Sequence, residues 1–209
     1  KKGLIFFSSP FDESAVDFLQ TLKVSFYKIA SAENIHFPLL KKVARTGKPM
    51  IISTGMISIK ELDEVVSFVR KCGCKNITLL KCTTEYPSSP KDSNILTIPY
   101  LKKRYKCDVG LSDHTLGIGA SIAAIAQGAT VIEKHLTLSR KDGAIDSFFS
   151  LEPKEFGLLV KECKIAFDSL GMVKINPSIS EKKYLKYRRS IYVSKNIKKN
   201  ERFTKLNLR

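Results

Sequence analysis

The sequence predicts an α/β protein that forms part of an eight-stranded α/β barrel. Short apolar runs alternate with segments in which apolar residues recur every three or four positions, which is typical of strands alternating with helices. Strands joined by such helical crossovers become parallel neighbours. The runs also end in polar residues, as expected where the C-terminal strand ends of a barrel form a site. Six runs show this pattern: Leu4–Ser9, Phe26–Ala30, Met50–Ser53, Ile77–Lys81, Val109–Ser112 and Val131–His135.

An open, doubly wound sheet is the alternative fold. Such a sheet usually places a glycine-rich phosphate loop after its first strand. The chain has neither a G-x-G-x-x-G nor a Walker motif, and Gly117-x-Gly119 is too short a match. The barrel is therefore the better interpretation. Because a barrel needs eight βα units and the chain starts at Lys1 without a methionine, we expect two strands to precede this sequence.

Two helices have the clearest boundaries. The first begins near Ser58 and has an apolar stripe made of Leu62, Val65, Val66 and Val69. The last barrel helix should begin at Pro153 and end at Gly171, because proline suits a first turn and glycine a helix end.

The composition changes after this helix. Residues 172–188 are rich in lysine, contain Asn176-Pro177 and show no clear period, which is typical of a linker. A new strand is predicted at Ser190–Ser194, followed by a turn over residues 196–201. We therefore expect a barrel domain (1–171), a linker (172–188) and the start of a second domain (189–209).

Composition indicates a globular protein of the cytoplasm. Hydrophobic residues make up 43% of the chain, and no apolar run approaches the roughly 20 residues that span a bilayer. No charged and apolar leader with a cleavage site is visible. The five cysteines are odd in number and form no C-x-x-C pair, which favours reduced packing thiols over a zinc or disulfide role.

The formal net charge of +16 raises the question of nucleic-acid binding. The lysines are spread along the chain, and aromatic residues are not interleaved with them for base stacking. A solvated basic surface is the preferred interpretation, with attraction of anionic substrates second and nucleic-acid binding third.

Two histidines close neighbouring predicted strands. Residues two apart share a face of a strand, so Ser112 pairs with His114, and Glu133 with His135. If the strands are adjacent, the two imidazoles could hold one divalent metal, and manganese, iron, zinc and magnesium all stay open. Glu133 would support a ligand or be a strand-end acid. The alternative is a pair of structural, hydrogen-bonded histidines.

Lysines and hydroxyls occur at the same strand ends. Lys28 and Lys81 either point outward between helices or reach into the barrel mouth as fixed cations for a carboxylate or phosphate. Hydroxyl donors at this level are Ser31, Ser53 and Ser112. Cations, hydroxyls and a metal together indicate a site for a small anionic substrate.

Three further residues have a site role and a structural role open to them. Asp146 lies in the loop 141–147 directly after the last predicted strand, where it could cover the mouth or only make a turn. Tyr86, before Pro87, has the same ambiguity. His36, at a junction between a loop and a helix, is expected to be structural or exposed.

Six segments in this order resemble the sialic acid synthase family. They are SSPFD (Ser8–Asp12), YKIASAE (Tyr27–Glu33), GKPMIISTGM (Gly47–Met56), LLKCTTEYP (Leu79–Pro87), GLSDHTLG (Gly110–Gly117) and VIEKHLTL (Val131–Leu138). The resemblance implies condensation of phosphoenolpyruvate with an N-acetylated amino sugar to a nine-carbon 2-keto acid. It also implies a TIM barrel followed by an antifreeze-like (SAF) domain, and residues 189–209 resemble the beginning of that domain. The family assembles as a domain-swapped homodimer.

The resemblance also implies roles for individual residues. His114 and His135 match ligands of a divalent metal, usually manganese or magnesium, and with Lys28 they would be catalytic. Residues around phosphoenolpyruvate would be Lys28, Ser31, Ser53, Ser112 and Thr84, although neuraminate enzymes have asparagine at the position of Thr84. Residues that contact the amino sugar would be Glu33, Tyr86 and Asp146.

The loop DSFFSLEP (Asp146–Pro153) and the segment TTEYP resemble pseudaminic acid synthases most. Neuraminate or legionaminic acid synthesis, another phosphoenolpyruvate aldolase reaction such as 3-deoxy-keto acid synthesis, and a non-catalytic basic module that binds polyanions are the alternatives. Because the family's remaining site residues would lie outside these 209 residues, we expect this piece alone to be inactive.

Overall fold

The computed structural model describes residues 2–209. The chain divides into two compact units, one ending at Gly171 and the other formed by Met172–Arg209. Each unit is described by itself.

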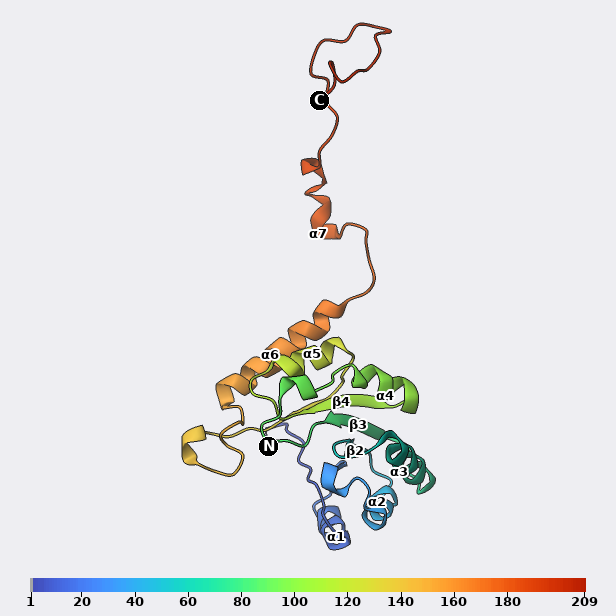
Figure 1. Cartoon of the computed structure of the whole chain (residues 1–209), viewed down its shortest axis with the longest axis vertical. Helices are drawn as coiled ribbons and strands as arrows, with labels where there is room; N and C mark the ends of the chain where they lie inside the picture. The colour runs from blue at the N-terminus through green and yellow to red at the C-terminus, as the bar shows by residue number, and fades with distance from the viewer. Residues whose placement is uncertain (1) are drawn as a thin grey trace. The chain divides into compact units, whose positions relative to one another are not determined.

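The first unit is built on a five-stranded parallel sheet that curls into a half-barrel (Figure 1). The strands lie in sequence order and each pairs with the next in parallel. They are β1 (Tyr27–Ile29), β2 (Met50–Ser53), β3 (Ile77–Cys82), β4 (Asp108–Asp113) and β5 (Ile132–Lys134). The predicted barrel class and these five strands are confirmed, each strand within one residue of its predicted ends.

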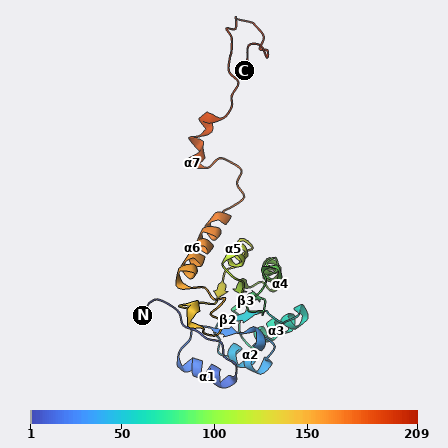
Figure 2. The ribbon, with the colours of Figure 1, turned by 60° about the vertical axis from the view of Figure 1, so that its left-hand side comes forward.

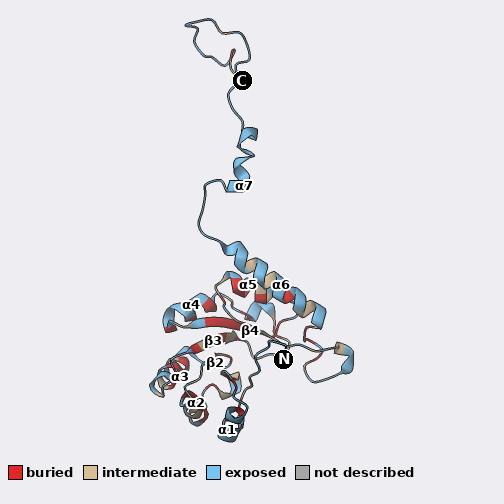
Figure 3. Ribbon diagram, turned by 180° about the vertical axis from the view of Figure 1, so that it is seen from behind, coloured by how far each residue is buried: buried red, intermediate tan, exposed pale blue. Residues whose placement is uncertain are grey.

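The helices form an arc around one side of the strands (Figure 2). They are α1 (Glu13–Thr21), α2 (Phe37–Ala44), α3 (Ile59–Lys71), α4 (Thr97–Tyr105), α5 (Gly119–Ala126) and α6 (Pro153–Leu170). Short 3-10 turns are η1 (Ser31–Glu33), η2 (Pro90–Asp92) and η3 (Arg140–Asp142). Buried residues line the sheet and the helix faces turned toward it (Figure 3), so the core fills the layer between sheet and helices.

Local sequence explains the boundaries of α3 and α6. Ser58 caps α3 in a capping box with Glu61, and the predicted stripe of apolar residues is buried against the sheet. Helix α6 begins with Pro153 after Glu152 and ends before Gly171, as predicted.

The predicted first strand, Leu4–Ser9, is wrong. This segment is extended and touches the sheet through one backbone hydrogen bond, from Lys28 N to Ser8 O (3.3 Å). A strand needs a ladder of such bonds on its neighbour, and Leu4 is 89% exposed. The half-barrel therefore has five hydrogen-bonded strands in place of the six that the apolar runs predicted.

The second unit has little regular structure. Residues 172–188, predicted as a linker, contain the short helix α7 (Ile179–Lys182) and the turn η4 (Leu185–Tyr187). The strand predicted at Ser190–Ser194 is reduced to one antiparallel bridge between Val193 and Leu208, flanked by backbone hydrogen bonds of Tyr192 with Arg209 and of Ser194 with Asn207. Within residues 2–209, no helix combines the length and apolar character needed to cross a membrane.

Candidate active site

Alternation along the strands selects the residues that face the inside of the half-barrel. Tyr27, Ile29, Ile77 and Leu79 belong to the core against the helices, so their sequence neighbours face the opposite way. At the C-terminal strand ends the inner face is polar and carries Lys28, Ser53, Cys82, Ser112 and Glu133. Five strands thus place polar side chains on one surface, at their C-terminal ends.

A lysine, an acid and a hydroxyl form the centre of this surface. Lys28 is buried, and its Nζ lies 3.3 Å from Glu133 Oε1. Ser112, the Cα partner of Glu133 in the β4–β5 register, donates a hydrogen bond to the same oxygen at 2.7 Å. Glu133 therefore holds the ammonium group of Lys28 inside the half-barrel.

The hydroxyl of Ser53 is buried without a hydrogen-bond partner among the described residues. A buried, unpaired hydroxyl is unfavourable unless a ligand or water satisfies it. The loop after Ser53 is fixed by Asn34, whose side-chain amide donates to Ser53 O (3.2 Å) and Gly55 O (2.9 Å). Ser53 thus offers a free donor in a fixed position.

Gly55 brings the loops after three strands together. A Cβ at this position would lie 2.1 Å from Thr84 Oγ1 and 2.6 Å from Ser31 Oγ, so any larger residue would have to displace these hydroxyls. Gly55 N donates to Ser31 Oγ at 3.1 Å. Ser31 and Thr84 therefore lie side by side, as two hydroxyls beside the inner face.

The two histidines lie at adjacent strand ends with their ring centroids 5.3 Å apart. His114 is buried, and its Nδ1 contacts the carbonyl of Thr83 at 2.8 Å. A carbonyl only accepts, so Nδ1 carries the proton and Nε2 keeps the lone pair. His135 Nδ1 lies 3.8 Å from Asp146 Oδ2. The prediction that the histidines occupy neighbouring strands is confirmed.

An aromatic wall surrounds both imidazoles. The Tyr86 ring lies 4.2 Å from that of His114 and 5.8 Å from that of His135. Phe149, which is buried, lies 4.8 Å from the His135 ring. Tyr86 and Asp146 therefore lie beside the histidines, which agrees with the site role left open for them.

Two adjacent imidazoles, of which His114 has its Nδ1 hydrogen-bonded to the Thr83 carbonyl, fit part of a divalent metal site. The described residues contain no group of three histidine, cysteine or acidic side chains arranged to hold a metal. The pair therefore fits as two ligands, to be completed by other donors.

Electrostatics differ between the two histidines. Burial by itself lowers the pKa of His114, but hydrogen bonds with Cys82 and with the Thr83 carbonyl outweigh it and raise that pKa. Burial, together with the neighbouring His114, lowers the pKa of His135. Burial also raises the pKa of Cys82, but hydrogen bonds with His114 and Ser31 bring it down to about 7.

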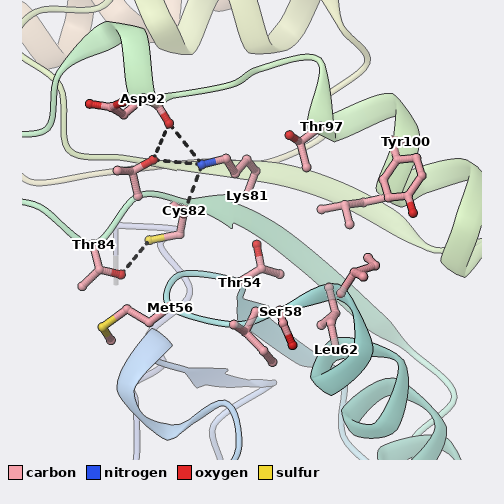
Figure 4. A pocket seen from close by; sticks show the side chains of 14 residues that line it. Thr54, Met56, Ser58, Leu62, Lys81, Cys82, Thr84, Asp92, Thr97 and Tyr100 are labelled. Atoms are coloured by element: carbon pink, nitrogen blue, oxygen red, sulfur yellow. Dashed lines mark hydrogen bonds between the residues drawn. The ribbon is translucent and has the colours of Figure 1, made fainter.

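Lys81 does not join this cluster. It has the same strand parity as Leu79, and its Nζ donates to Cys82 O (3.2 Å), Thr83 Oγ1 (2.9 Å) and Asp92 O (3.5 Å). Figure 4 shows it in a cavity of about 680 Å³ that Thr97 and Tyr100 of α4 line together with Cys82 and Thr84. Burial there lowers the pKa of Lys81. Of the two alternatives left open for the lysines, Lys81 therefore takes the outward one and Lys28 the inward one.

The side chain of Glu33 makes its contact outside the cluster around Lys28. Its carboxylate lies 3.3 Å from Nδ1 of His36, an exposed residue at the start of α2. Its predicted contact with a sugar stays a prediction.

Residue patterns alone missed several residues that shape the site. Gly55 and Asn34 act through loop geometry, which has no sequence signal of its own. Cys82 was counted as a packing thiol, although strand parity with Leu80 would have placed it on the inner face. Asp113 and Lys134, each directly before a histidine, were not singled out either.

A match to the NeuB family model covers residues 1–174. The chain belongs to the NeuB family. Its relatives include the N,N'-diacetyllegionaminic acid synthase of Campylobacter jejuni, 42% identical over the whole of this chain and 63% of the relative. The pseudaminic acid synthase of Helicobacter pylori is 39% identical, over the whole of this chain and 62% of the relative.

Solved structures agree with this family. The N-acetylneuraminic acid synthetase of Leptospira borgpetersenii superposes with a TM-score of 0.81 at 37% identity, over 90% of this chain and 65% of that one. The expected likeness to sialic acid synthases is confirmed. This NeuB chain spans slightly more than 60% of the length of the two curated relatives.

Proposed function

We propose that the intact protein condenses phosphoenolpyruvate with an N-acetylated amino sugar, forming a nine-carbon 2-keto sugar acid and releasing phosphate. The observation that carries this proposal is the buried Lys28, held by Glu133 beside the unpaired hydroxyl of Ser53. A fixed cation beside a free hydrogen-bond donor, both buried, suits the binding of a small anion. Membership of the NeuB family supports the same reaction class.

Lys28 and the surrounding hydroxyls are proposed to bind phosphoenolpyruvate. Lys28 neutralises negative charge, and Ser53, Ser112 and Ser31 donate hydrogen bonds to its carboxylate and phosphate oxygens, with Thr84 beside them. Glu133 limits the movement of the ammonium group through their contact at 3.3 Å. Because these groups are held by the strands, little reorganisation is needed when the substrate binds.

His114 and His135 are proposed to hold a divalent metal, manganese or magnesium. Such an ion, when bound, polarises a carbonyl oxygen as a Lewis acid. The Thr83 carbonyl engages Nδ1 of His114, which leaves Nε2 as the nitrogen that would bind the ion, and Asp146 lies beside His135 Nδ1.

The acceptor sugar is proposed to contact Glu33, Tyr86 and Asp146. In the reaction, C3 of phosphoenolpyruvate forms a bond to the aldehyde carbon of the open-chain sugar. Water then adds to C2, and cleavage of the C–O bond releases phosphate. Lys28 stabilises the anionic groups of the substrate throughout.

We propose pseudaminic acid as the product, supported by the loop Asp146–Pro153, in which Phe149 packs on His135. Legionaminic and N-acetylneuraminic acid are the alternatives. The identities of 42% to a legionaminic acid synthase and 39% to a pseudaminic acid synthase are too similar to choose between those two products. The proposed assembly is a domain-swapped homodimer. An acceptor screen with the full-length protein, measuring phosphate release for each N-acetylated amino sugar, decides the product.

Substituting Lys28 tests the proposal directly. Lys28→Met in the full-length protein should reduce kcat/KM for phosphoenolpyruvate at least about 100-fold, because a buried anion loses its cation. Phosphate release with sugar present is the measurement. Lys42→Met, which breaks an exposed pair with Asp17, is the matched control and should behave as wild type. Wild-type kinetics in Lys28→Met would contradict the proposed site.

A further inference from the structure

A fully buried ion pair lies directly behind the two histidines. Lys134 Nζ is 2.9 Å from Asp113 Oδ2, and each side chain is only 1% exposed. The backbone of the edge strand β5 stays partly exposed, but the charged groups do not. Asp113 and Lys134 are Cα partners in the β4–β5 register. The pair therefore joins the two strands at their C-terminal ends.

Further hydrogen bonds hold this pair in one geometry. Asp113 Oδ1 accepts from Thr115 N and Thr115 Oγ1, both at 2.8 Å, and Oδ2 accepts from Ser121 Oγ at 2.6 Å. Lys134 Nζ also donates to the Thr115 carbonyl. The charges thus tie the strand ends to the loop after β4 and to helix α5.

Stability alone gives a weak account of such a pair. Removing two charges from water costs about as much as their attraction returns, so well-packed apolar residues often stabilise a fold equally well. What the pair fixes is position. His114 follows Asp113 and His135 follows Lys134, and alternation turns the imidazoles to the inner face while the ion pair occupies the outer face.

We propose that Asp113 and Lys134 are positioning residues that set the spacing of the His114 and His135 imidazoles by clamping β4 to β5 from behind. The position of His135 depends on this ion pair more than the position of His114 does. His114 is tied to the Thr83 carbonyl at 2.8 Å, whereas the contact of His135 with Asp146 is long, at 3.8 Å. The inference rests on the proposed metal role of the histidines, but the spacing itself is measurable without metal.

The test uses Asp113→Asn, Lys134→Met and the double variant in the full-length protein. Each single variant leaves one buried charge without its partner and should lower the melting temperature strongly. The double variant should regain much of that loss. Two readouts report position: Mn²⁺ affinity by calorimetry, and proton–proton Overhauser effects between the two imidazoles of metal-free protein.

The double variant is expected to bind Mn²⁺ about 10- to 100-fold more weakly than wild type and to lose the Overhauser effects between the rings. Lys42→Met, which breaks an exposed pair, should change neither readout. If the double variant does not fold, Thr115→Val removes one hydrogen bond to Asp113 while keeping both charges, and a smaller loss in the same direction is expected.

Wild-type Mn²⁺ affinity and intact Overhauser effects in the folded double variant, or in Thr115→Val where it replaces that variant, would overturn the inference. Rings that show no Overhauser effect in wild type would overturn it too. If wild type shows the Overhauser effects but binds no Mn²⁺, the proposed metal role fails, and the comparison of ring spacing still decides the positioning role.

Discussion

Gly55 leaves almost no space between the loops after β1, β2 and β3. A Cβ would fall within 2.6 Å of hydroxyls on both Ser31 and Thr84, two of the proposed phosphoenolpyruvate contacts. A side chain here must push one of them away. The space between these loops, more than their charge, therefore limits which residue can occupy position 55.

Gly55→Ala tests this limit. We expect KM for phosphoenolpyruvate to rise at least about tenfold, a loss comparable to one hydrogen bond to a charged group. Steady-state kinetics of the full-length protein measure it. Gly119→Ala is the matched control, because its Cβ would meet nothing within 4 Å. An unchanged KM in Gly55→Ala would show that Ser31 and Thr84 do not touch the substrate.

Strands β4 and β5 approach closely at a second glycine. A Cβ on Gly110 would lie 2.2 Å from the carbonyl oxygen of Val131, a backbone atom that cannot rotate away. Leu111 N also donates to this carbonyl at 2.9 Å, so the strand ends that carry both histidines depend on this approach.

Gly110→Ala should destabilise the protein by at least about 1–3 kcal/mol, the usual range for overpacking. Urea unfolding followed by circular dichroism measures the change. Gly157→Ala, in helix α6 with free space around its Cβ, should instead stabilise by up to about 1 kcal/mol. Equal stability of the two variants would argue against the close approach of β4 and β5.

The N-terminus of α3 carries a pH-dependent contribution to stability. Hydrogen bonds from the Ser58 hydroxyl and backbone lower the pKa of Glu61 below its ordinary 4.5. A lowered folded-state pKa means that the stabilisation is complete above the unfolded-state pKa and is lost as the pH falls through the folded-state value.

Ser58→Ala should therefore cost about 1 kcal/mol at neutral pH, and part of this difference from wild type should disappear in acid. Urea unfolding at pH 7 and at pH 3 measures both effects. Ser67→Ala, at an exposed position within the same helix, is the control and should lack the pH dependence. A constant or growing difference toward low pH would contradict the capping box.

At the scale of the whole molecule, the net charge of +16 bears on how anions approach the site. Long-range attraction raises the encounter rate of anionic substrates and is screened by salt, with a Debye length of about 10 Å at 0.1 M. Raising NaCl from about 0.05 to about 0.5 M should increase KM for phosphoenolpyruvate several-fold while leaving KM for a neutral sugar nearly unchanged. Equal salt effects on both substrates would exclude steering by the surface charge.

The sequence predicted the five paired strands, the start of α3 and both ends of α6, because these depend on local patterns such as apolar period, proline and capping residues. It placed His114 and His135 on neighbouring strands for the same reason. It failed at Leu4–Ser9, where an apolar run makes one backbone hydrogen bond to the sheet, and at Ser190–Ser194, where pairing is limited to one antiparallel bridge, since a strand is defined by continued pairing.

The site divides in the same way. The sequence by itself determined which chemistry is available: two histidines, a lysine and hydroxyls at strand ends, and a family resemblance that the comparisons bear out. Only the tertiary structure decided that the side chain of Lys28 lies inside the half-barrel while that of Lys81 lies on the helix side. Only the structure showed that Ser53 is unpaired, that Gly55 must lack a Cβ, and that Asp113 meets Lys134. The contacts of Lys28 with Glu133, of Gly55 with Ser31 and of Asp113 with Lys134 join residues far apart in the chain, and such contacts exist only once the strands have curled together.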